Sequence, residues 1–71
     1  MSSQKKQRRM QRAEIRRVTD EMRGIRRDLE QAYSRFDNLA DPMQMDACIF
    51  EINALRAKYN CAVHDLKQLS Q

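Results

Sequence analysis

The chain has 71 residues, 34% of them charged, with a formal net charge of +4, one glycine, one proline and no tryptophan. A chain this short forms at most one domain with a small core, and its shortage of glycine and other turn residues argues against a β protein. No apolar run approaches the ~20 residues of a membrane-spanning helix, so we expect a small helical protein that packs helix against helix or against a partner.

The positive charge is concentrated at the N-terminus. Residues 1 to 18 carry seven of the 14 basic residues and one acidic residue. No apolar stretch follows this charge, which is unlike a secretory signal, and we expect a cytoplasmic protein. We interpret residues 1 to 14 as a basic arm, either frayed or a helical extension. Its candidate contacts with a nucleic acid or an acidic partner are Lys5, Lys6, Arg8, Arg9, Arg12 and Arg16.

If the arm is helical, most of these cations share one face. The residues that fall within an arc of about 100° are Lys5, Arg8, Arg9, Arg12 and Arg16. Such a face can follow a phosphate backbone with a steep salt dependence, whereas like charges at four-residue spacing and the helix dipole oppose helix formation. Three uses of the arm stay open: a solvated, solubilising terminus, contact with nucleic acid, and contact with an acidic protein or a membrane surface.

Apolar residues recur at alternating intervals of three and four in both halves of the chain. The series in the first half is Ile15, Val18, Met22, Ile25, Leu29, Ala32, Phe36 and Leu39. The series in the second half is Met45, Cys48, Ile52, Leu55, Tyr59, Ala62, Leu66 and Leu69. We call these two series the seam. This heptad spacing predicts two coiled-coil-like helices, at about residues 15 to 39 and about residues 42 to 70.

The segment between the two series carries a helix start signal. Asp41 is a favoured N-cap, and Pro42 suits the first helical position. Gln44 lies at the position that is glutamate or glutamine in a capping box. A turn at about residues 40 to 43 is so short that the two helices must run antiparallel. The sequence therefore predicts an all-α, antiparallel two-helix hairpin over residues 15 to 70.

The two halves of the seam can be aligned throughout their length. Pairing Leu39 with Met45 at the turn and Ile15 with Leu69 at the far end fills every layer. Several layers place a large side chain opposite a small one, which keeps the thickness of the seam constant. This register leaves the basic arm with no helix opposite it.

Residues 45 to 66 carry a second apolar series besides the seam. It has the same heptad spacing, lies roughly opposite the seam, and consists of Ala47, Phe50, Ala54, Ala57, Cys61 and His64. Small residues let a neighbouring helix approach closely, and we predict dimerisation into a four-helix bundle. The expected oligomer or partner face is Ala47, Ile49, Phe50, Ala54, Ala57, Cys61 and Val63. Two alternatives stay open: another helical protein occupies the face, or its alanines are helix formers on a solvated surface.

No residues suggest a catalytic, cofactor or metal site. Cys48 and Cys61 lie roughly 20 Å apart along one predicted helix, too far to form a disulfide within the chain, and we expect both thiols to be reduced and buried. Cys61 and His64 with Asp65 nearby offer fewer protein ligands than a structural zinc site requires. The chain has one histidine and no paired nucleophile and base, so we expect a protein that is not an enzyme. Gly24 lies in the middle of the first predicted helix and off the seam, where it marks either a close contact or a soft point of the helix.

The segment FEINALRAKYNCAVHDLK, residues 50 to 67, resembles the YaaL-like family of small Firmicute proteins of unknown function. The family pattern is an aromatic residue followed by Glu and an apolar residue, then Ala-Lys-Tyr, then acidic-x-Lys, here Phe50, Glu51, Ile52, Ala57, Lys58, Tyr59, Asp65 and Lys67. A basic N-terminus followed by Phe36 and the Pro42 turn is also similar, whereas Phe50 replaces a common tyrosine and His64 a common arginine. The resemblance covers about residues 29 to 67 and implies a small cytoplasmic bacterial helical protein. The resemblance implies no particular activity for this chain.

These observations favour a non-catalytic helical interaction or scaffold protein that associates with itself or with another helical protein. The alternative is a nucleic-acid-binding accessory protein that uses the basic arm. Neither interpretation requires a small-molecule substrate, a cofactor, a metal or a membrane span.

Overall fold

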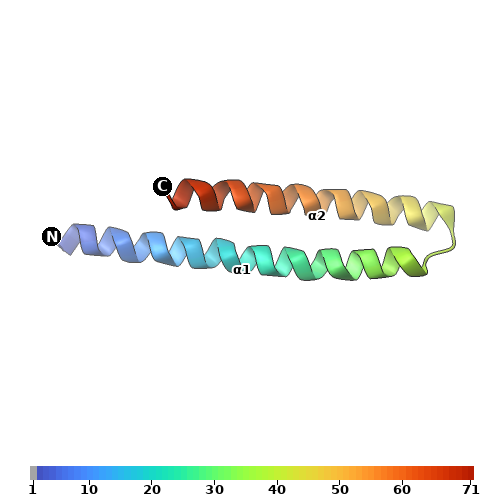
Figure 1. The fold of residues 1–71 in the computed structure, drawn as a ribbon, viewed down its shortest axis with the longest axis horizontal. Coiled ribbons are helices and arrows are strands. Elements are labelled where there is room, and N and C mark those ends of the chain that lie inside the picture. Colours follow the sequence, from blue (N-terminus) through green and yellow to red (C-terminus); the bar gives the residue numbers. More distant parts are fainter. Residues whose placement is uncertain (1) are drawn as a thin grey trace.

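The structure is a computed structural model that describes residues 2 to 71 and consists of two long α-helices. α1 spans Ser2–Asn38 and α2 spans Pro42–Leu69, and the two helices lie side by side and antiparallel in a rod 61 Å long (Figure 1). The predicted all-α helical hairpin is confirmed. Within residues 2 to 71, neither helix has an apolar stretch long enough to cross a bilayer.

α2 begins at the predicted cap. Asp41 has extended backbone angles, and its carboxylate accepts a hydrogen bond of 2.9 Å from the backbone N–H of Met43. The carbonyl of Asp41 accepts a second bond of 2.9 Å from the N–H of Met45. Pro42 takes the first helical position, where its missing N–H leaves no bond unmade. Gln44, which we expected to complete a capping box, lines a groove beside the turn.

The core of the hairpin is the predicted seam. Its buried members are Val18, Ile25, Ala32, Cys48, Ile52 and Ala62, and every other seam residue is half-buried. Among residues 3 to 71, whose side chains the structure describes, the only other residues that are not exposed are Thr19, Gly24 and Val63. A core that is one layer of side chains thick leaves the outer side of each helix open to solvent.

Contacts near the turn follow the predicted register. Phe36 of α1 and Leu39, the residue that follows α1, are half-buried and pack against a buried cluster formed by Ala32, Cys48 and Ile52. The Cys48 thiol also donates a hydrogen bond of 3.2 Å to the carbonyl of Ala32. Small residues from both helices therefore let the two backbones approach closely here, while Ile52 fills the space between them.

α1 includes the basic arm, which we predicted to be either frayed or a helical extension. The sequence led us to expect the first helix from about residue 15, whereas α1 begins at Ser2. Residues 2 to 14 contain no glycine, proline or β-branched residue, and their many Gln, Lys and Arg side chains extend a nucleated helix at little cost. The basic arm is therefore a helical extension, continuous with the helix of the hairpin.

Side-chain contacts mark the two ends of the hairpin. At the turn end, Arg35 and Glu51 form an exposed ion pair of 2.6 Å across the helices. At the open end, the side-chain amide of Gln11 donates a hydrogen bond to the carbonyl of Leu69, where α2 ends. α1 therefore extends past α2 by residues 2 to 10, which we call the overhang (Figure 1).

Gly24 is the only glycine in the chain, and its surroundings do not require it. A Cβ added there would meet only the guanidinium of Arg27 at 3.9 Å, an ordinary contact, and Gly24 does not have a positive φ. We predict that Gly24→Ala stabilises the hairpin by about 0.5 to 1 kcal/mol, because alanine loses less backbone entropy on folding. Urea unfolding followed by circular dichroism measures this, and a lower midpoint for the variant would contradict it.

Candidate interaction surfaces

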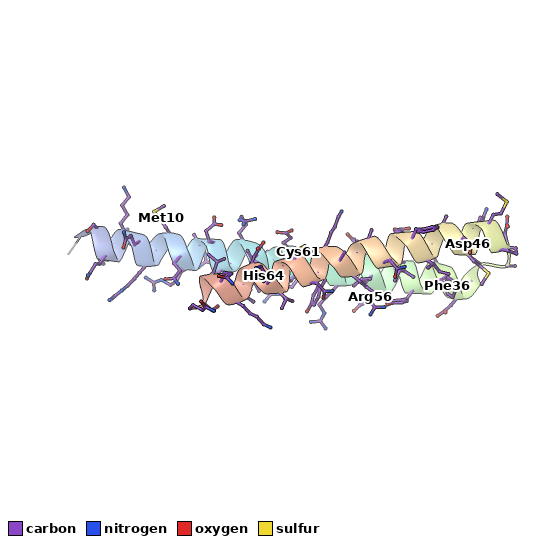
Figure 2. The ribbon with its side chains drawn as sticks, turned by 90° about the horizontal axis from the view of Figure 1, so that it is seen from above. Met10, Phe36, Asp46, Arg56, Cys61 and His64 are labelled. Atoms are coloured by element: carbon purple, nitrogen blue, oxygen red, sulfur yellow. The ribbon has the colours of Figure 1, made fainter. Side chains whose placement is uncertain are left out.

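The outer side of α2, away from α1, carries exposed apolar residues. Phe50 is 75% exposed and Met43 is 81% exposed. Every member of the second apolar series is exposed, and Figure 2, which views α2 from its outer side, labels Cys61 and His64 there. Met43, which we did not predict for this surface, lies one heptad before Phe50. We call this surface the α2 stripe and define it as Met43, Ala47, Phe50, Ala54, Ala57, Cys61 and His64.

The α2 stripe owes its position to the heptad spacing of α2. At 100° per residue, its members centre about 150° away from the seam, so burial of the seam against α1 leaves the stripe in solvent. The stripe is about 30 Å long. Two further residues predicted for this face lie between the stripe and the seam: Ile49 is 42% exposed, whereas Val63 is half-buried. Val63 therefore belongs to the edge of the hairpin core and not to an open face.

Polar residues border the α2 stripe on both sides. One border consists of Glu51, Lys58 and Asp65, and the other consists of Asp46, Asn53, Asn60 and Lys67, all of them exposed. Each border carries charges of both signs. The α2 stripe is thus an apolar strip with a polar rim, which is the usual arrangement of a helix–helix interface.

A second candidate surface is a line of cations along α1. All of the predicted contacts, from Lys5 to Arg16, are exposed. Because α1 is one continuous helix, the arc that holds five of them continues into the hairpin, where it holds three more exposed arginines. We call this set the basic stripe and define it as Lys5, Arg8, Arg9, Arg12, Arg16, Arg23, Arg26 and Arg27. Lys6 is exposed but lies outside this arc.

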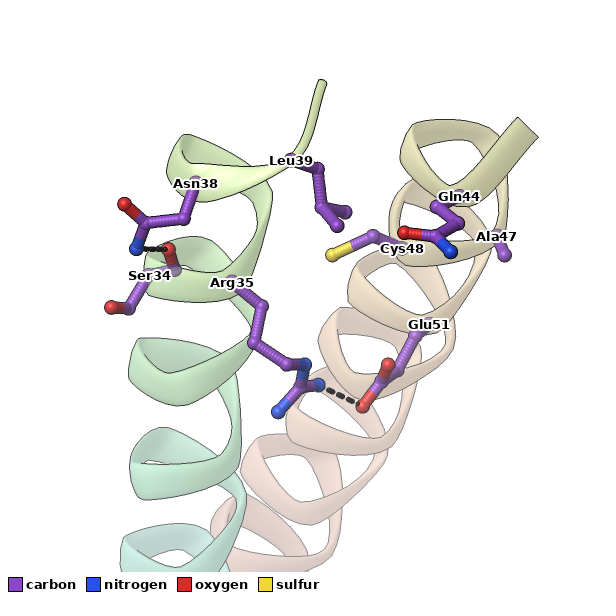
Figure 3. A pocket seen from close by; sticks show the side chains of 8 residues that line it. All are labelled: Ser34, Arg35, Asn38, Leu39, Gln44, Ala47, Cys48 and Glu51. Atoms are coloured by element: carbon purple, nitrogen blue, oxygen red, sulfur yellow. Dashed lines mark hydrogen bonds and ion pairs between the residues drawn. The ribbon is translucent and has the colours of Figure 1, made fainter. Parts of the chain in front are cut away.

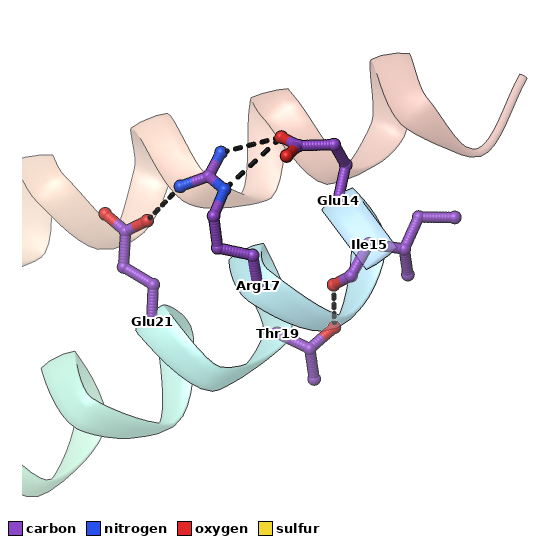
Figure 4. Close-up of polar contacts among 5 residues, drawn as sticks. All are labelled: Glu14, Ile15, Arg17, Thr19 and Glu21. Carbon is purple, nitrogen blue, oxygen red and sulfur yellow. Dashed lines mark hydrogen bonds and ion pairs between the residues drawn. The ribbon is translucent and has the colours of Figure 1, made fainter. Parts of the chain in front are cut away.

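The ion pairs of α1 lie mostly on the side opposite the basic stripe. Arg17 lies 3.1 Å from Glu14 and 3.6 Å from Glu21 (Figure 4). Its hydrogen bond to Glu14, together with the negative charge of that carboxylate, raises the pKa of Arg17 above its ordinary value. Among the described residues, Arg23 is the one member of the basic stripe within ion-pair distance of an acid, 3.7 Å from Asp20.

An open groove of about 500 Å³ lies between the helices beside the turn (Figure 3). It is lined by Ser34, Arg35, Asn38, Leu39, Gln44, Ala47, Cys48 and Glu51. Several of its polar groups already have partners, because Arg35 pairs with Glu51 and the amide of Asn38 donates to the carbonyl of Ser34 at 2.9 Å. The groove shares Ala47 with the α2 stripe.

The two cysteines have different environments. Cys48 is buried in the seam and Cys61 is exposed, so the expectation that both thiols are buried is wrong for Cys61. The reason is that Cys61 belongs to the α2 stripe, which faces away from α1. In the part of the chain that the structure describes, no three side chains of His, Cys, Asp or Glu come together as a metal site would need.

Comparisons with protein-family models, with curated proteins and with solved structures find no match for this chain. The resemblance of residues 50 to 67 to the YaaL-like family therefore stays a prediction that rests on those residues. The α2 stripe and the basic stripe are the two surfaces from which a function can be inferred.

Proposed function

We propose that this protein is a non-catalytic interaction module that forms a homodimer through the α2 stripe, giving a four-helix bundle. The observation that carries the proposal is Phe50, an aromatic side chain that is 75% exposed in a line of alanines on the outer side of α2. Apolar strips with a polar rim are typical sites of association. The small neighbours of Phe50 allow a second helix to approach closely enough to enclose its ring.

The α2 stripe is complementary to itself when two copies meet antiparallel about a two-fold axis. In that arrangement Phe50 faces Cys61 of the second copy, and Ala54 faces Ala57. The two-fold axis passes between the alanines and repeats each contact. The largest side chain of the stripe thus meets a small one, and the helices come closest where only methyl groups separate them.

The borders of the α2 stripe are complementary in the same arrangement. The facing border pairs are Glu51 with Lys58, Asp46 with Lys67, and Asn53 with Asn60. Each pair occurs twice because of the two-fold axis, so four opposite-charge pairs frame the interface. This charge complementarity favours a second copy of the chain over an unrelated helical partner as the occupant of the stripe.

Neighbouring registers lack this complementarity. Sliding one copy by a heptad in one direction places Phe50 opposite Ala54 but Glu51 opposite Glu51. Sliding it in the other direction places Phe50 opposite Gln68 and Lys58 opposite Lys58. Like charges at these positions oppose both alternatives, as in coiled coils whose flanking charges select one alignment. The borders therefore specify one register as well as the partner.

A second copy also supplies the core that one hairpin lacks. The described side chains of a single hairpin include six buried apolar residues, and chains of fewer than about 70 to 80 residues rarely reach high stability on one such core. Pairing through the α2 stripe adds a second apolar layer between the two copies. Folding and association would then support each other.

Exchanging the charges at one border tests both the dimer and its register. We predict that Asp46→Lys, which places lysines opposite each other at both ends of the interface, weakens dimerisation about fivefold. Adding Lys67→Asp restores opposite charges, so the double variant should recover most of the lost affinity in sedimentation equilibrium. Asp37→Lys on α1 makes the same charge change outside the interface and should leave the dimerisation constant unchanged.

Two results would contradict the proposal. A wild-type chain that sediments with its monomer mass of 8.5 kDa at every concentration would leave the α2 stripe to a different helical partner or to solvent. A double variant as weak as Asp46→Lys alone would show that the dimer, if present, does not use this register.

A further inference from the structure

The basic stripe is longer and more uniform than a solvated terminus requires. It places eight cations on one side of α1 between residues 5 and 27, a span of about 33 Å at 1.5 Å per residue. No acidic residue lies in its arc over that span, although Asp20 lies at its edge and Glu30 ends it. The other sides of α1 carry Glu14, Glu21 and Asp28. Charge is therefore segregated around α1, and the basic stripe continues from the overhang into the hairpin.

The cations of the basic stripe are available to an anionic partner. All eight are exposed, and within the described residues only Arg23 has an ion-pair partner, itself exposed. Like charges on one helix face destabilise α1, and a bound polyanion would remove that repulsion. Seven of the eight are arginines, whose guanidinium groups bind phosphate through two parallel hydrogen bonds.

The composition of the basic stripe selects the kind of polyanion. Thr19 is the only uncharged residue in its arc between residues 5 and 27, and its hydroxyl donates to the carbonyl of Ile15 at 2.7 Å (Figure 4). The arc therefore lacks the apolar anchors of a protein interface, the apolar face of a lipid-binding helix and the aromatic platforms that stack single-stranded bases. We propose that the basic stripe binds the phosphate backbone of a DNA duplex.

The dimensions of α1 fit a B-form duplex. The stripe is about as long as one helical turn of B-DNA, which is about 34 Å. The overhang is a single helix without a neighbour, and the B-form major groove, about 12 Å wide, admits one α-helix, whereas the major groove of A-form RNA is too narrow. Lys5, Lys6, Arg8 and Arg9 spread over about 160° of the overhang, so they reach phosphates on both walls of the groove.

The first measurement is the fluorescence anisotropy of a labelled duplex of about 20 base pairs, titrated with the full chain at about 50 and about 200 mM salt. With about eight phosphate contacts, the affinity should fall roughly 10⁴-fold over this range. DNA binding does not depend on the proposed dimer, because the basic stripe and the α2 stripe lie on different helices. Absence of duplex binding at about 50 mM salt would overturn the proposal and leave the dimer unaffected.

Two double variants that lose the same net charge distinguish the effect of the basic stripe on DNA binding from the effect of net charge. Arg26→Gln with Arg27→Gln removes two stripe cations from the body of the hairpin, and should weaken duplex binding about tenfold and lower the salt slope by about two. Arg17→Gln with Arg35→Gln removes the same charge from the other side of α1, outside both stripes, and should change binding less than twofold. Circular dichroism checks that both variants stay helical. Equal losses in the two variants would overturn the stripe as the binding surface.

Three competing ligands test the identity of the partner. Duplex RNA, single-stranded DNA of the same length and vesicles rich in anionic lipid are each titrated at about 100 mM salt. The proposal expects the DNA duplex to bind at least about tenfold more tightly than duplex RNA or the single strand, and the vesicles to bind no more tightly than these. Equal or tighter binding of any of the three would overturn the assignment to duplex DNA.

Discussion

A Phe50→Asp variant should sediment as a monomer at concentrations at which the wild-type chain is a dimer. The two-fold axis places Phe50 in the interface twice. Removing a large anchor from an enclosed position costs about 2 kcal/mol or more, so the two copies together lose about 4 kcal/mol, or roughly 1,000-fold in the dimerisation constant. Because Phe50 is 75% exposed in the single hairpin, the variant should keep its helical hairpin.

Met10→Asp is the matched control for this experiment. Met10 is also an exposed apolar residue, 61% exposed, but it lies on α1, where the overhang meets the paired part of the hairpin, and outside the α2 stripe (Figure 2). The same loss of apolar surface there should leave the dimer intact. If Phe50→Asp keeps the wild-type mass, or if both variants dissociate equally, the α2 stripe is not the dimer interface.

The hairpin could be predicted from the sequence because its core is a single line of residues on each helix. Sixteen seam positions follow one spacing, and all of them are buried or half-buried in the structure. The turn could also be predicted from the sequence, because Asp41 supplies the N-cap of α2 and Pro42 its first helical residue. Where burial depends only on helical spacing, the pattern of side chains in the sequence is enough to find it.

The start of α1 could not be predicted by the same reasoning. Charge repulsion and the helix dipole argue that residues 2 to 10 fray, whereas good helix propensity and continuity with a packed helix argue that they stay helical. These opposing effects are of similar size, and α1 begins at Ser2. Treating residue 14 as a boundary also hid the continuation of the basic stripe to Arg26 and Arg27.

The partner face was found only in part, for two physical reasons. Val63 is as apolar as a core residue, but its half-buried state depends on how close α1 lies, which the spacing along one helix does not report. Met43 was not predicted to belong to the partner face because it follows the N-cap so closely. It nevertheless continues the spacing of the α2 stripe and is 81% exposed. Cysteine is usually buried in proteins, but Cys61 is exposed because it lies on the α2 stripe.

The hairpin core should be most sensitive at Ile52. This side chain is 7% exposed and packs in a buried cluster with Ala32 and Cys48. Ile52→Ala should cost about 2 to 4 kcal/mol of unfolding free energy, because the small residues around it cannot move in to fill the cavity. In a core of this size such a loss is a large fraction of the total stability, and we expect a much lower melting temperature.

Ile49→Ala makes the identical change on the same helix, at a residue that is 42% exposed, and should cost less than about 1 kcal/mol. Thermal unfolding followed by circular dichroism at several protein concentrations compares the two variants with the wild type. If folding and dimerisation are linked, the wild-type melting temperature rises with concentration. The deficit of Ile52→Ala should persist at every concentration, because the lost contacts lie within each hairpin. Equal melting temperatures for the two variants would mean that the seam does not supply the stability of the fold.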